Sequence, residues 1–177
     1  KNLAGVGVIF YVLTALRALL RTQQWFNPQR LPEPNLAELL DLVALGTVAD
    51  VVTLDYNNRI LVSQGLKRMQ IDKTRPGIQA LFQVAQRDMR QAKPFDLGFA
   101  IGPRINAAGR LENMEIGIAC LLAEDPATAA ELAEQLNELN RARQEIEQTM
   151  LQEALALADQ IIVGNGLSIT AFHPDWH

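Results

Sequence analysis

Apolar residues recur at helical spacing along most of the chain, and glycine, proline and asparagine residues separate the segments. The first pattern predicts a helix from about Gly5 to Gln23, ending before a proline-rich stretch. Asn35 is a suitable N-cap for a second helix, Leu36 to Leu45, which leads into a run rich in threonine and valine. Further helices are predicted from Asn57 or Asn58 to Gln70, from Pro76 to Ala85 and from Met114 to Ala123.

The most apolar segment of the first helix is Leu3 to Leu16. It is several residues shorter than a membrane-spanning helix, and Arg17 and Arg21 follow it. A lysine ahead of an apolar run imitates a secretory signal, but no small-residue cleavage site follows. We therefore interpret this segment as a buried helix and expect no membrane-spanning segment.

The distribution of glycine and proline separates two later parts of the chain. Between Pro94 and Gly109 these residues are frequent, which predicts a turn-rich segment. From Ala127 to Val163 there are none, and apolar residues recur at heptad spacing. This pattern predicts one long connector helix of about 55 Å. The run Leu167 to Phe172, after the turn sequence Gly164 to Gly166, is predicted to be a strand.

Composition indicates a folded chain from a reducing compartment. Of 177 residues 49% are hydrophobic, which excludes a disordered protein, and a single cysteine excludes an internal disulfide. A cytoplasmic location is therefore expected. The cysteine, Cys120, lies in an apolar run, so we interpret it as a core residue. The chain begins at Lys1 without a methionine and stops just after the predicted strand, so we expect a fragment of a longer protein.

Charge is distributed unevenly although the net charge is −4. Residues 1–110 carry +6 and residues 111–177 carry −10. The basic excess is concentrated in eight residues: Arg59, Lys67, Arg68, Lys73, Arg75, Arg87, Arg90 and Lys93. They form either a face that attracts phosphate groups or the solvated outer faces of amphipathic helices, and charge alone does not decide between the two.

Few residues offer catalytic chemistry. Both histidines lie in the last five residues, which excludes a Ser-His-Asp or Cys-His arrangement within the body of the chain. Asp50 is the only charge in an apolar run that we expect to be buried. A buried carboxylate must be hydrogen-bonded, paired or bound to a cation, and oxygen ligands suit hard divalent metals. A capping or turn aspartate is the alternative, and local sequence favours it.

The segment GPRINAAGR, Gly102 to Arg110, is the second candidate. It sets two arginines and an asparagine among small residues that allow close approach of the backbone. The guanidinium groups of Arg104 and Arg110 could each hold a phosphate group through two hydrogen bonds, with the Asn106 amide nearby. The alternative is a tight structural turn with solvated arginines, and the two interpretations are about equally supported by the residues alone.

Four segments together resemble the RecJ branch of the DHH phosphoesterase superfamily, which are single-strand-specific 5′ to 3′ exonucleases. They are NLAGVGVIF from Asn2, ALGTVADVVTLDYNNRILVSQGL from Ala44, GPRINAAGRL from Gly102 and AFHPDWH from Ala171. The resemblance implies an α/β parent protein of which this fragment is the mostly α-helical part. Residues 1–112 would be the C-terminal part of the DHH catalytic domain, 113–163 connector helices, and 164–177 the first strand of the DHH-associated domain, a second α/β domain.

The resemblance also implies roles for individual residues. Asp50 would be the last acidic ligand of a two-metal site for Mn²⁺ or Mg²⁺, which reverses the capping interpretation. Arg104, Asn106 and Arg110 would approach the substrate backbone or the metal site, and Arg104 would take part in catalysis. His173 and His177 match the opening of the DHH-associated domain and are expected to contact substrate. The superfamily's Asp-His-His signature does not occur in this sequence, so we expect the fragment alone to be inactive.

The function implied by the resemblance is hydrolysis of single-stranded DNA by a metal-activated water, in DNA recombination and repair. Single-strand-binding protein and a helicase are the partners it implies, with no membrane. Two alternatives stay open. One is a DHH phosphoesterase that acts on short oligonucleotides or small phosphate compounds. The other is a non-enzymatic helical adaptor that uses the long helix as a partner surface.

Overall fold

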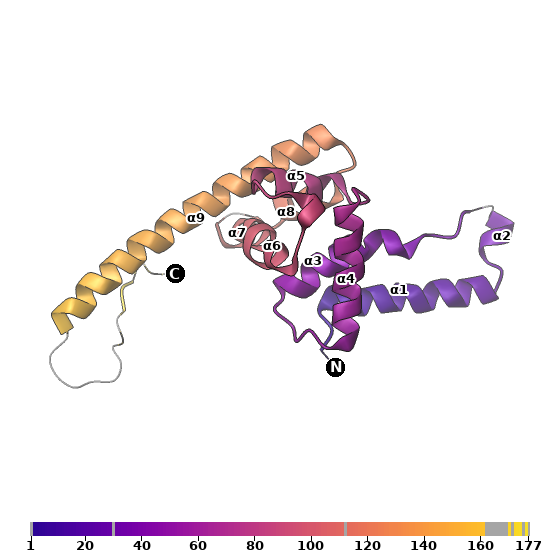
Figure 1. Ribbon diagram of the computed structural model, residues 1–177, viewed down its shortest axis with the longest axis horizontal. Coiled ribbons are helices and arrows are strands. Elements are labelled where there is room, and N and C mark those ends of the chain that lie inside the picture. The colour runs from indigo at the N-terminus through magenta and orange to yellow at the C-terminus, as the bar shows by residue number, and fades with distance from the viewer. Residues whose placement is uncertain are drawn as a thin grey trace.

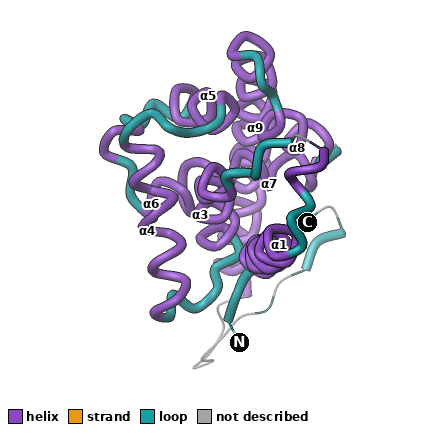
Figure 2. Tube along the Cα trace, turned by 90° about the vertical axis from the view of Figure 1, so that its right-hand side faces the viewer, coloured by secondary structure: helices purple, strands orange, loops and turns teal. Residues whose placement is uncertain are grey.

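The structure, a computed structural model, describes residues 2–29, 31–111, 113–161, 170, 172–174 and 176. These residues form helices and loops, with no strand among them (Figure 2). In chain order the elements are α1 (Gly5–Thr22), α2 (Phe26–Gln29), η1 (Leu36–Leu39), α3 (Leu40–Ala49), α4 (Tyr56–Gln70), α5 (Pro76–Val84), η2 (Met89–Gln91), α6 (Pro94–Asp96), η3 (Leu97–Ile101), α7 (Gly102–Leu111), α8 (Glu115–Leu122) and α9 (Pro126–Ile161). The prediction of a mostly helical chain is confirmed.

The core is shared by two packed groups of helices: α3 packs on α4, and α5, α7 and α8 pack on the first half of α9 (Figure 1). Its largest fully buried side chains include Phe82, Met69 and Leu136. Helices α3 and α4 can approach closely because Gly65 has no side chain. A Cβ atom at this position would lie only 2.2 Å from the Leu40 carbonyl oxygen. The helix α4 begins earlier than expected, since its N-cap is Asp55.

The first helix is not the buried helix that the apolar run predicts. Only Gly7 of α1 is buried, and Val8, Ile9 and Val12 are among its exposed apolar residues. The start of α1 packs on α3, where Val6 lies against Gly46, and the rest of the helix extends away from the core (Figure 1). Among the described residues α1 is the one helix long and apolar enough to cross a membrane, which is weak evidence, because helices of soluble cores pass the same test.

The segment predicted to be turn-rich is helical instead. It forms α6, the π-helical turn η3 and α7. Pro94 occupies the first turn of α6, where backbone N–H groups form no hydrogen bond within the helix, so the absence of an N–H in proline costs nothing. The glycines serve packing, since a Cβ atom at Gly102 would meet Ala49 at 3.4 Å and one at Gly98 would meet Val48 at 3.3 Å. Small residues here allow helices to touch, so they do not mark turns.

The long helix is confirmed, with α9 running from Pro126 to Ile161. Ala129, Ala133 and Leu136 in its first half are buried in the core. Its second half extends beyond the other helices, and Leu151 and Leu155 there are exposed (Figure 1). Most of the predicted strand Leu167 to Phe172 lies outside the described residues.

The interpretation of Cys120 as a core residue is confirmed. Its side chain is fully buried and its Sγ lies 3.9 Å from the Gly77 and Ala129 carbonyl oxygens. Burial raises the pKa of the Cys120 thiol to about 11 from 9.0, so the folded chain holds about a hundredfold less thiolate at pH 8. We expect iodoacetamide to label Cys120 at least about a hundredfold more slowly in the folded chain than in urea. Mass spectrometry would measure both labelling rates. Equal rates in the folded chain and in urea would contradict the burial of Cys120.

Candidate functional site

Asp50 ends helix α3, where it is the C-cap residue. Its side chain is exposed, so the expectation of a buried carboxylate is wrong, although Val43, Ala44, Leu45 and Thr47 earlier in the same run are buried. The buried carboxylate of this helix is Asp41, at the opposite end. In the described part of the chain the Asp50 carboxylate makes no hydrogen bond or ion pair. Both of its oxygens are therefore available to an outside group.

The local backbone gives Asp50 no stabilising role. A carboxylate at the C-terminal end of a helix faces the negative end of the helix dipole, which is unfavourable by about 0.3–1 kcal/mol. The next residue, Val51, has φ of 55°, a left-handed conformation that is strained for a β-branched side chain, and it is 88% exposed. Strain of this kind is typical of functional sites. A cation bound at Asp50 would offset the repulsion from the helix end.

The structure brings the start of the Gly102–Arg110 segment to this end of α3. Gly102, the first residue of α7, packs against Ala49, which directly precedes Asp50. The absence of a side chain at Gly102 permits this approach. The two segments singled out in the sequence thus meet, although more than fifty residues separate them.

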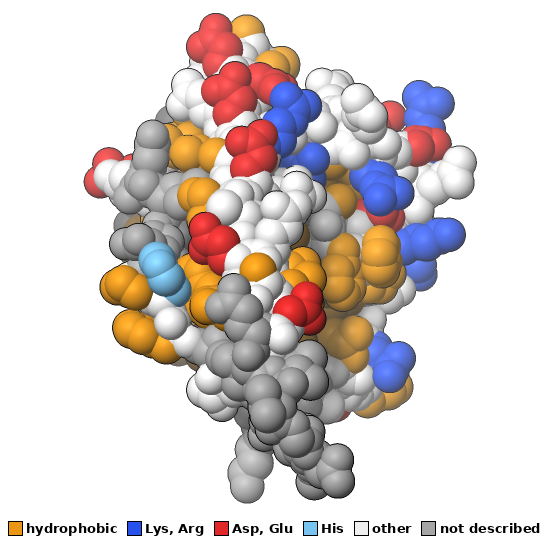
Figure 3. Space-filling model, turned by 90° about the vertical axis from the view of Figure 1, so that its left-hand side faces the viewer, with side chains coloured by type: hydrophobic (Ala, Val, Ile, Leu, Met, Phe, Trp, Pro, Cys, Tyr) orange, Lys and Arg blue, Asp and Glu red, His pale blue; other side chains and the backbone are white. Residues whose placement is uncertain are grey.

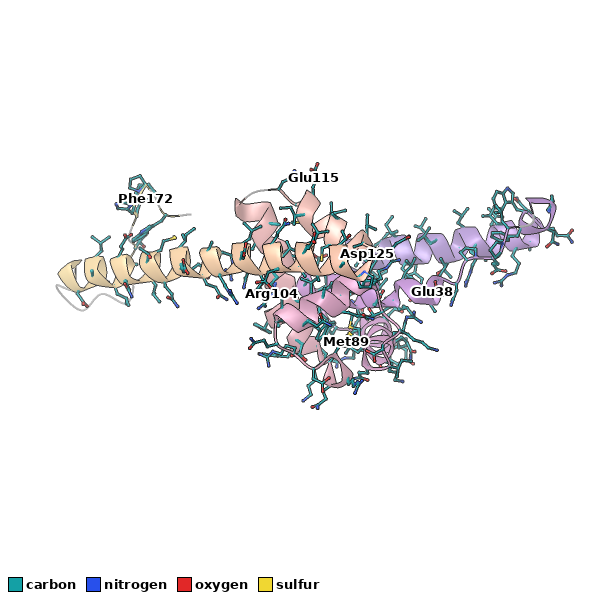
Figure 4. All side chains as sticks on the ribbon, turned by 90° about the horizontal axis from the view of Figure 1, so that it is seen from above. Glu38, Met89, Arg104, Glu115, Asp125 and Phe172 are labelled. Atoms are coloured by element: carbon teal, nitrogen blue, oxygen red, sulfur yellow. The ribbon has the colours of Figure 1, made fainter. Side chains whose placement is uncertain are left out.

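Arg104 lies between α7 and the long helix α9 (Figure 4). Its Nε donates to Asn137 Oδ1 at 3.1 Å, and its Nη1 donates to the Ala100 carbonyl oxygen at 2.6 Å. Asn137 is 2% exposed and its amide also donates to Glu134 Oε1 at 3.1 Å. No sequence pattern pointed to Asn137, a polar residue inside the buried half of α9. It fixes the orientation of the guanidinium group.

The electrostatic surroundings of Arg104 favour a bound anion. Burial lowers the pKa of the Arg104 guanidinium, and the positive charges of Arg141 and Arg87 lower it further, whereas Glu134 raises it. No carboxylate lies within ion-pair distance of this side chain among the described residues. Arg87 is paired with Asp96 at 3.8 Å, whereas Arg104 and Arg141 form no ion pair among the described residues. A half-buried arginine with an unpaired arginine nearby attracts a phosphate group, because the anion would compensate their charges.

The remaining predicted site residues are placed less closely together. Asn106 is exposed on α7, and Arg110 lies near the end of the same helix, with its side chain outside the described residues. His177 also lies outside them. His173 packs on Trp176 with ring centroids 5.9 Å apart.

The described tail lies beside the second half of α9, away from Arg104. Trp176 Nε1 donates to Glu153 Oε2 at 2.9 Å, and Figure 4 shows Phe172 on the far half of the helix. Asn137, which holds Arg104, is sixteen residues earlier on α9, about 24 Å along the axis. The structure therefore does not bring His173 next to Arg104.

An apolar pocket of about 450 Å³ adjoins the same end of α3. Val51, Phe95 and Phe99 line it, and the two phenylalanine rings stack 4.7 Å apart while remaining exposed. Exposed aromatic rings are suitable for stacking with a nucleobase or for packing against another part of a protein.

The described residues do not assemble a complete metal site. Nowhere among them do three His, Cys, Asp or Glu side chains group closely enough to hold an ion. The Asp50 carboxylate has the chemistry of a ligand for a hard divalent cation, because it is exposed, makes no hydrogen bond or ion pair with a described residue, and lies on a helix end that favours positive charge. A cation at Asp50 would need further ligands from outside the described residues.

Comparison with solved structures identifies the class. The chain resembles a crystal structure of an exonuclease bound to manganese, with a TM-score of 0.64 and 37% identity over 75% of this chain and 33% of that one. It also resembles a Mg²⁺ complex from Thermus thermophilus, with a TM-score of 0.61 and 38% identity over 72% of this chain and 20% of that one. The described helices therefore have the fold of a segment of a metal-binding exonuclease.

Both of those structures are of RecJ, and the sequence comparison agrees. The chain is 56% identical to the single-stranded-DNA-specific exonuclease RecJ of Dickeya dadantii strain 3937 and 54% identical to that of Escherichia coli strain K12. Both matches cover this whole chain but only 31% of the relative, and no family model matches the chain. The chain is therefore related over its whole length to the RecJ family.

Proposed function

We propose that this chain is part of a metal-dependent 5′ to 3′ exonuclease for single-stranded DNA that acts in DNA recombination and repair inside the cell. The observation that supports the proposal most directly is the meeting of Asp50 and the Gly102–Arg110 segment at one end of α3. A free carboxylate next to an arginine-bearing helix offers one ligand for a cation and one for a phosphate group. The relatives are named as exonucleases specific for single-stranded DNA, which supports this substrate for the proposed enzyme.

Each residue would have a distinct task. Asp50 would hold one of two divalent cations, Mn²⁺ or Mg²⁺, with the other ligands supplied from outside the described residues. Bound cations would supply an activated water and neutralise charge on the phosphate. Arg104, held by Asn137, would stabilise the phosphate oxygens during hydrolysis, and Asn106 and Arg110 on the same helix would contact the DNA backbone. His173 and His177 would contact substrate further along the strand.

The domain boundaries remain those expected from the sequence. Residues 1–112 would complete a DHH catalytic domain, residues 113–163 would connect it to the next domain, and residues 164–177 would begin a DHH-associated α/β domain. The exposed apolar face of α1 supports this division, because such a face is stable when another part of a protein covers it. Single-strand-binding protein and a helicase would be partners of the whole enzyme.

A longer protein that contains this chain should release nucleotides from single-stranded DNA in the presence of Mn²⁺. The chain by itself should release none above the buffer blank, because its described residues provide one isolated carboxylate for the metal site. Release would be measured from 5′-labelled oligonucleotides of increasing length. Robust Mn²⁺-dependent release by the isolated chain would contradict the assignment of missing ligands to other parts of the protein.

The same substrates separate the proposal from the small-phosphate alternative. An exonuclease is expected to degrade long single strands at least as fast as di- or trinucleotides, since it binds the backbone at several phosphates. A preference for dinucleotides would contradict the exonuclease and favour the other phosphoesterase. A folded full-length protein that hydrolyses none of them would favour the helical adaptor.

A further inference from the structure

A group of basic side chains lies at the opposite end of α3 from Asp50. There a pocket of about 550 Å³ opens between the end of α4 and the start of α5. Arg68 comes from the last turn of α4, Lys73 from the loop, and Arg75 is the N-cap of α5. These three residues belong to the basic group that charge alone could not assign to a role. Figure 3 shows several Lys and Arg side chains along the right-hand side of the face it draws, and others beside acidic side chains near its top.

The buried carboxylate in this pocket is already satisfied. Asp41 Oδ2 accepts hydrogen bonds from Thr74 Oγ1 at 2.6 Å and from the Arg75 backbone N–H at 3.1 Å, while Oδ1 accepts from the Leu42 N–H at 2.7 Å. Asp41 therefore anchors the loop that carries Lys73 and Arg75. The Lys73 N–H donates to the Arg68 carbonyl oxygen at 2.9 Å, which holds the two cationic residues at the same opening.

The arginines of the pocket lack partners for buried donors. The Nε atoms of Arg68 and Arg75 are both buried without an acceptor among the described residues. Neither side chain forms an ion pair among the described residues. Glu38, labelled in Figure 4, also lines the pocket, but its Oε1 accepts a hydrogen bond from Asn35 Nδ2 at 3.2 Å. A buried donor without an acceptor is unfavourable, so an anion that reaches both guanidinium groups would be stabilising.

The geometry favours a phosphate over a carboxylate. The three cations approach from the end of α4, the loop that follows and the N-cap of α5, and Asn35, Glu38 and Asp41 line the rest of the pocket. A tetrahedral phosphate presents oxygens in all of these directions, and arginine guanidinium groups bind such oxygens in pairs. A planar carboxylate would leave part of the donors unused.

We propose that this pocket, lined by Arg68, Lys73 and Arg75, binds a phosphate group. The phosphate comes either from the backbone of a single DNA strand or from a free nucleoside monophosphate. The first source rests on the proposed function; the second does not. Asp41 and Asp50 are nine residues apart on α3, about 13.5 Å, so the pocket is separate from the candidate metal site.

The test measures binding by the full-length protein without divalent metal, where hydrolysis cannot occur. The double variant Arg68→Gln, Arg75→Gln is compared with Arg59→Gln, Arg90→Gln, which removes the same charge outside this pocket. Fluorescence anisotropy of a labelled oligothymidylate at several KCl concentrations gives the salt dependence. Phosphorus-31 line broadening of thymidine monophosphate gives binding of the free nucleotide. Thermal midpoints check the folding of every variant.

For a backbone phosphate, we expect the pocket variant to bind the oligonucleotide about tenfold more weakly. In a plot of log binding constant against log KCl concentration, the negative slope should become shallower by about 0.7 for one lost phosphate contact. For a free phosphate, we expect the line broadening of thymidine monophosphate to disappear. If the double variant fails to fold, Lys73→Gln at an exposed position should weaken the same binding about threefold. If the pocket variant binds both ligands as tightly as the control variant does, the proposal is overturned. This outcome does not depend on whether the wild type proves to be an exonuclease.

Discussion

Replacing Asp50 by alanine should reduce Mn²⁺-dependent release of nucleotides by the full-length protein by at least about a thousandfold, with folding unchanged. The loss follows because a two-metal site that misses one carboxylate cannot hold both cations in place. Folding should be unaffected because Asp50 is exposed, makes no hydrogen bond or ion pair with a described residue, and lies at the unfavourable end of the helix dipole. Initial rates and thermal midpoints at matched concentration measure the two effects.

Two further variants sharpen this result. Asp50→Asn keeps the shape of the side chain but removes its charge, so it should lose nearly as much activity as Asp50→Ala. Glu131→Ala removes one exposed carboxylate from the outer face of α9 and should retain full activity. Unchanged activity of Asp50→Ala would return this residue to a turn or capping role and remove the metal interpretation.

The largest effect on stability is expected at Gly77. A Cβ atom there would lie 1.9 Å from the Cys120 carbonyl oxygen and 2.7 Å from its carbon, both of them backbone atoms of α8. Gly77→Ala must therefore push α5 and α8 apart, and Cys120 is a fully buried member of the core. We expect a loss of about 3 kcal/mol in the free energy of unfolding, which lowers the thermal midpoint by about 6–12 °C.

Gly5→Ala is the matched control for this change. Gly5 is the first residue of α1, and a Cβ atom there would meet nothing within 4 Å. The same substitution should therefore leave the thermal midpoint roughly unchanged, as measured by circular dichroism at 222 nm. A Gly77→Ala midpoint within about 2 °C of the wild type would show that α5 and α8 do not approach as closely as the structure places them.

Local patterns in the sequence predict the helices well. The absence of glycine and proline and the heptad spacing predict α9 almost to its ends, and the apolar run around Cys120 predicts its burial. Both predictions depend only on neighbouring residues. The segment from Pro94 to Gly109 is different, because its glycines allow helices to touch Val48 and Ala49 across the fold, and a turn would use the same residue types.

The two aspartates of α3 show why the site was only partly predictable. Asp41 and Asp50 both adjoin apolar residues, yet Asp41 is buried because the loop at Thr74 folds over it, and Asp50 is exposed because the helix ends there. Which of them is covered depends on contacts between segments about thirty residues apart. The sequence motifs singled out Asp50 and Arg104 as candidates, but Asn137, which orients Arg104, is reached only through the packing of α7 on α9.

The central claim is that Asp50 is a metal ligand, and diffraction tests it most directly. Crystals of the full-length protein soaked in Mn²⁺ would be measured at the manganese absorption edge. We expect an anomalous peak within about 2.5 Å of an Asp50 carboxylate oxygen, the distance range of hard divalent cations bound to oxygen. Occupied manganese sites in the same crystals with none at Asp50 would contradict the claim.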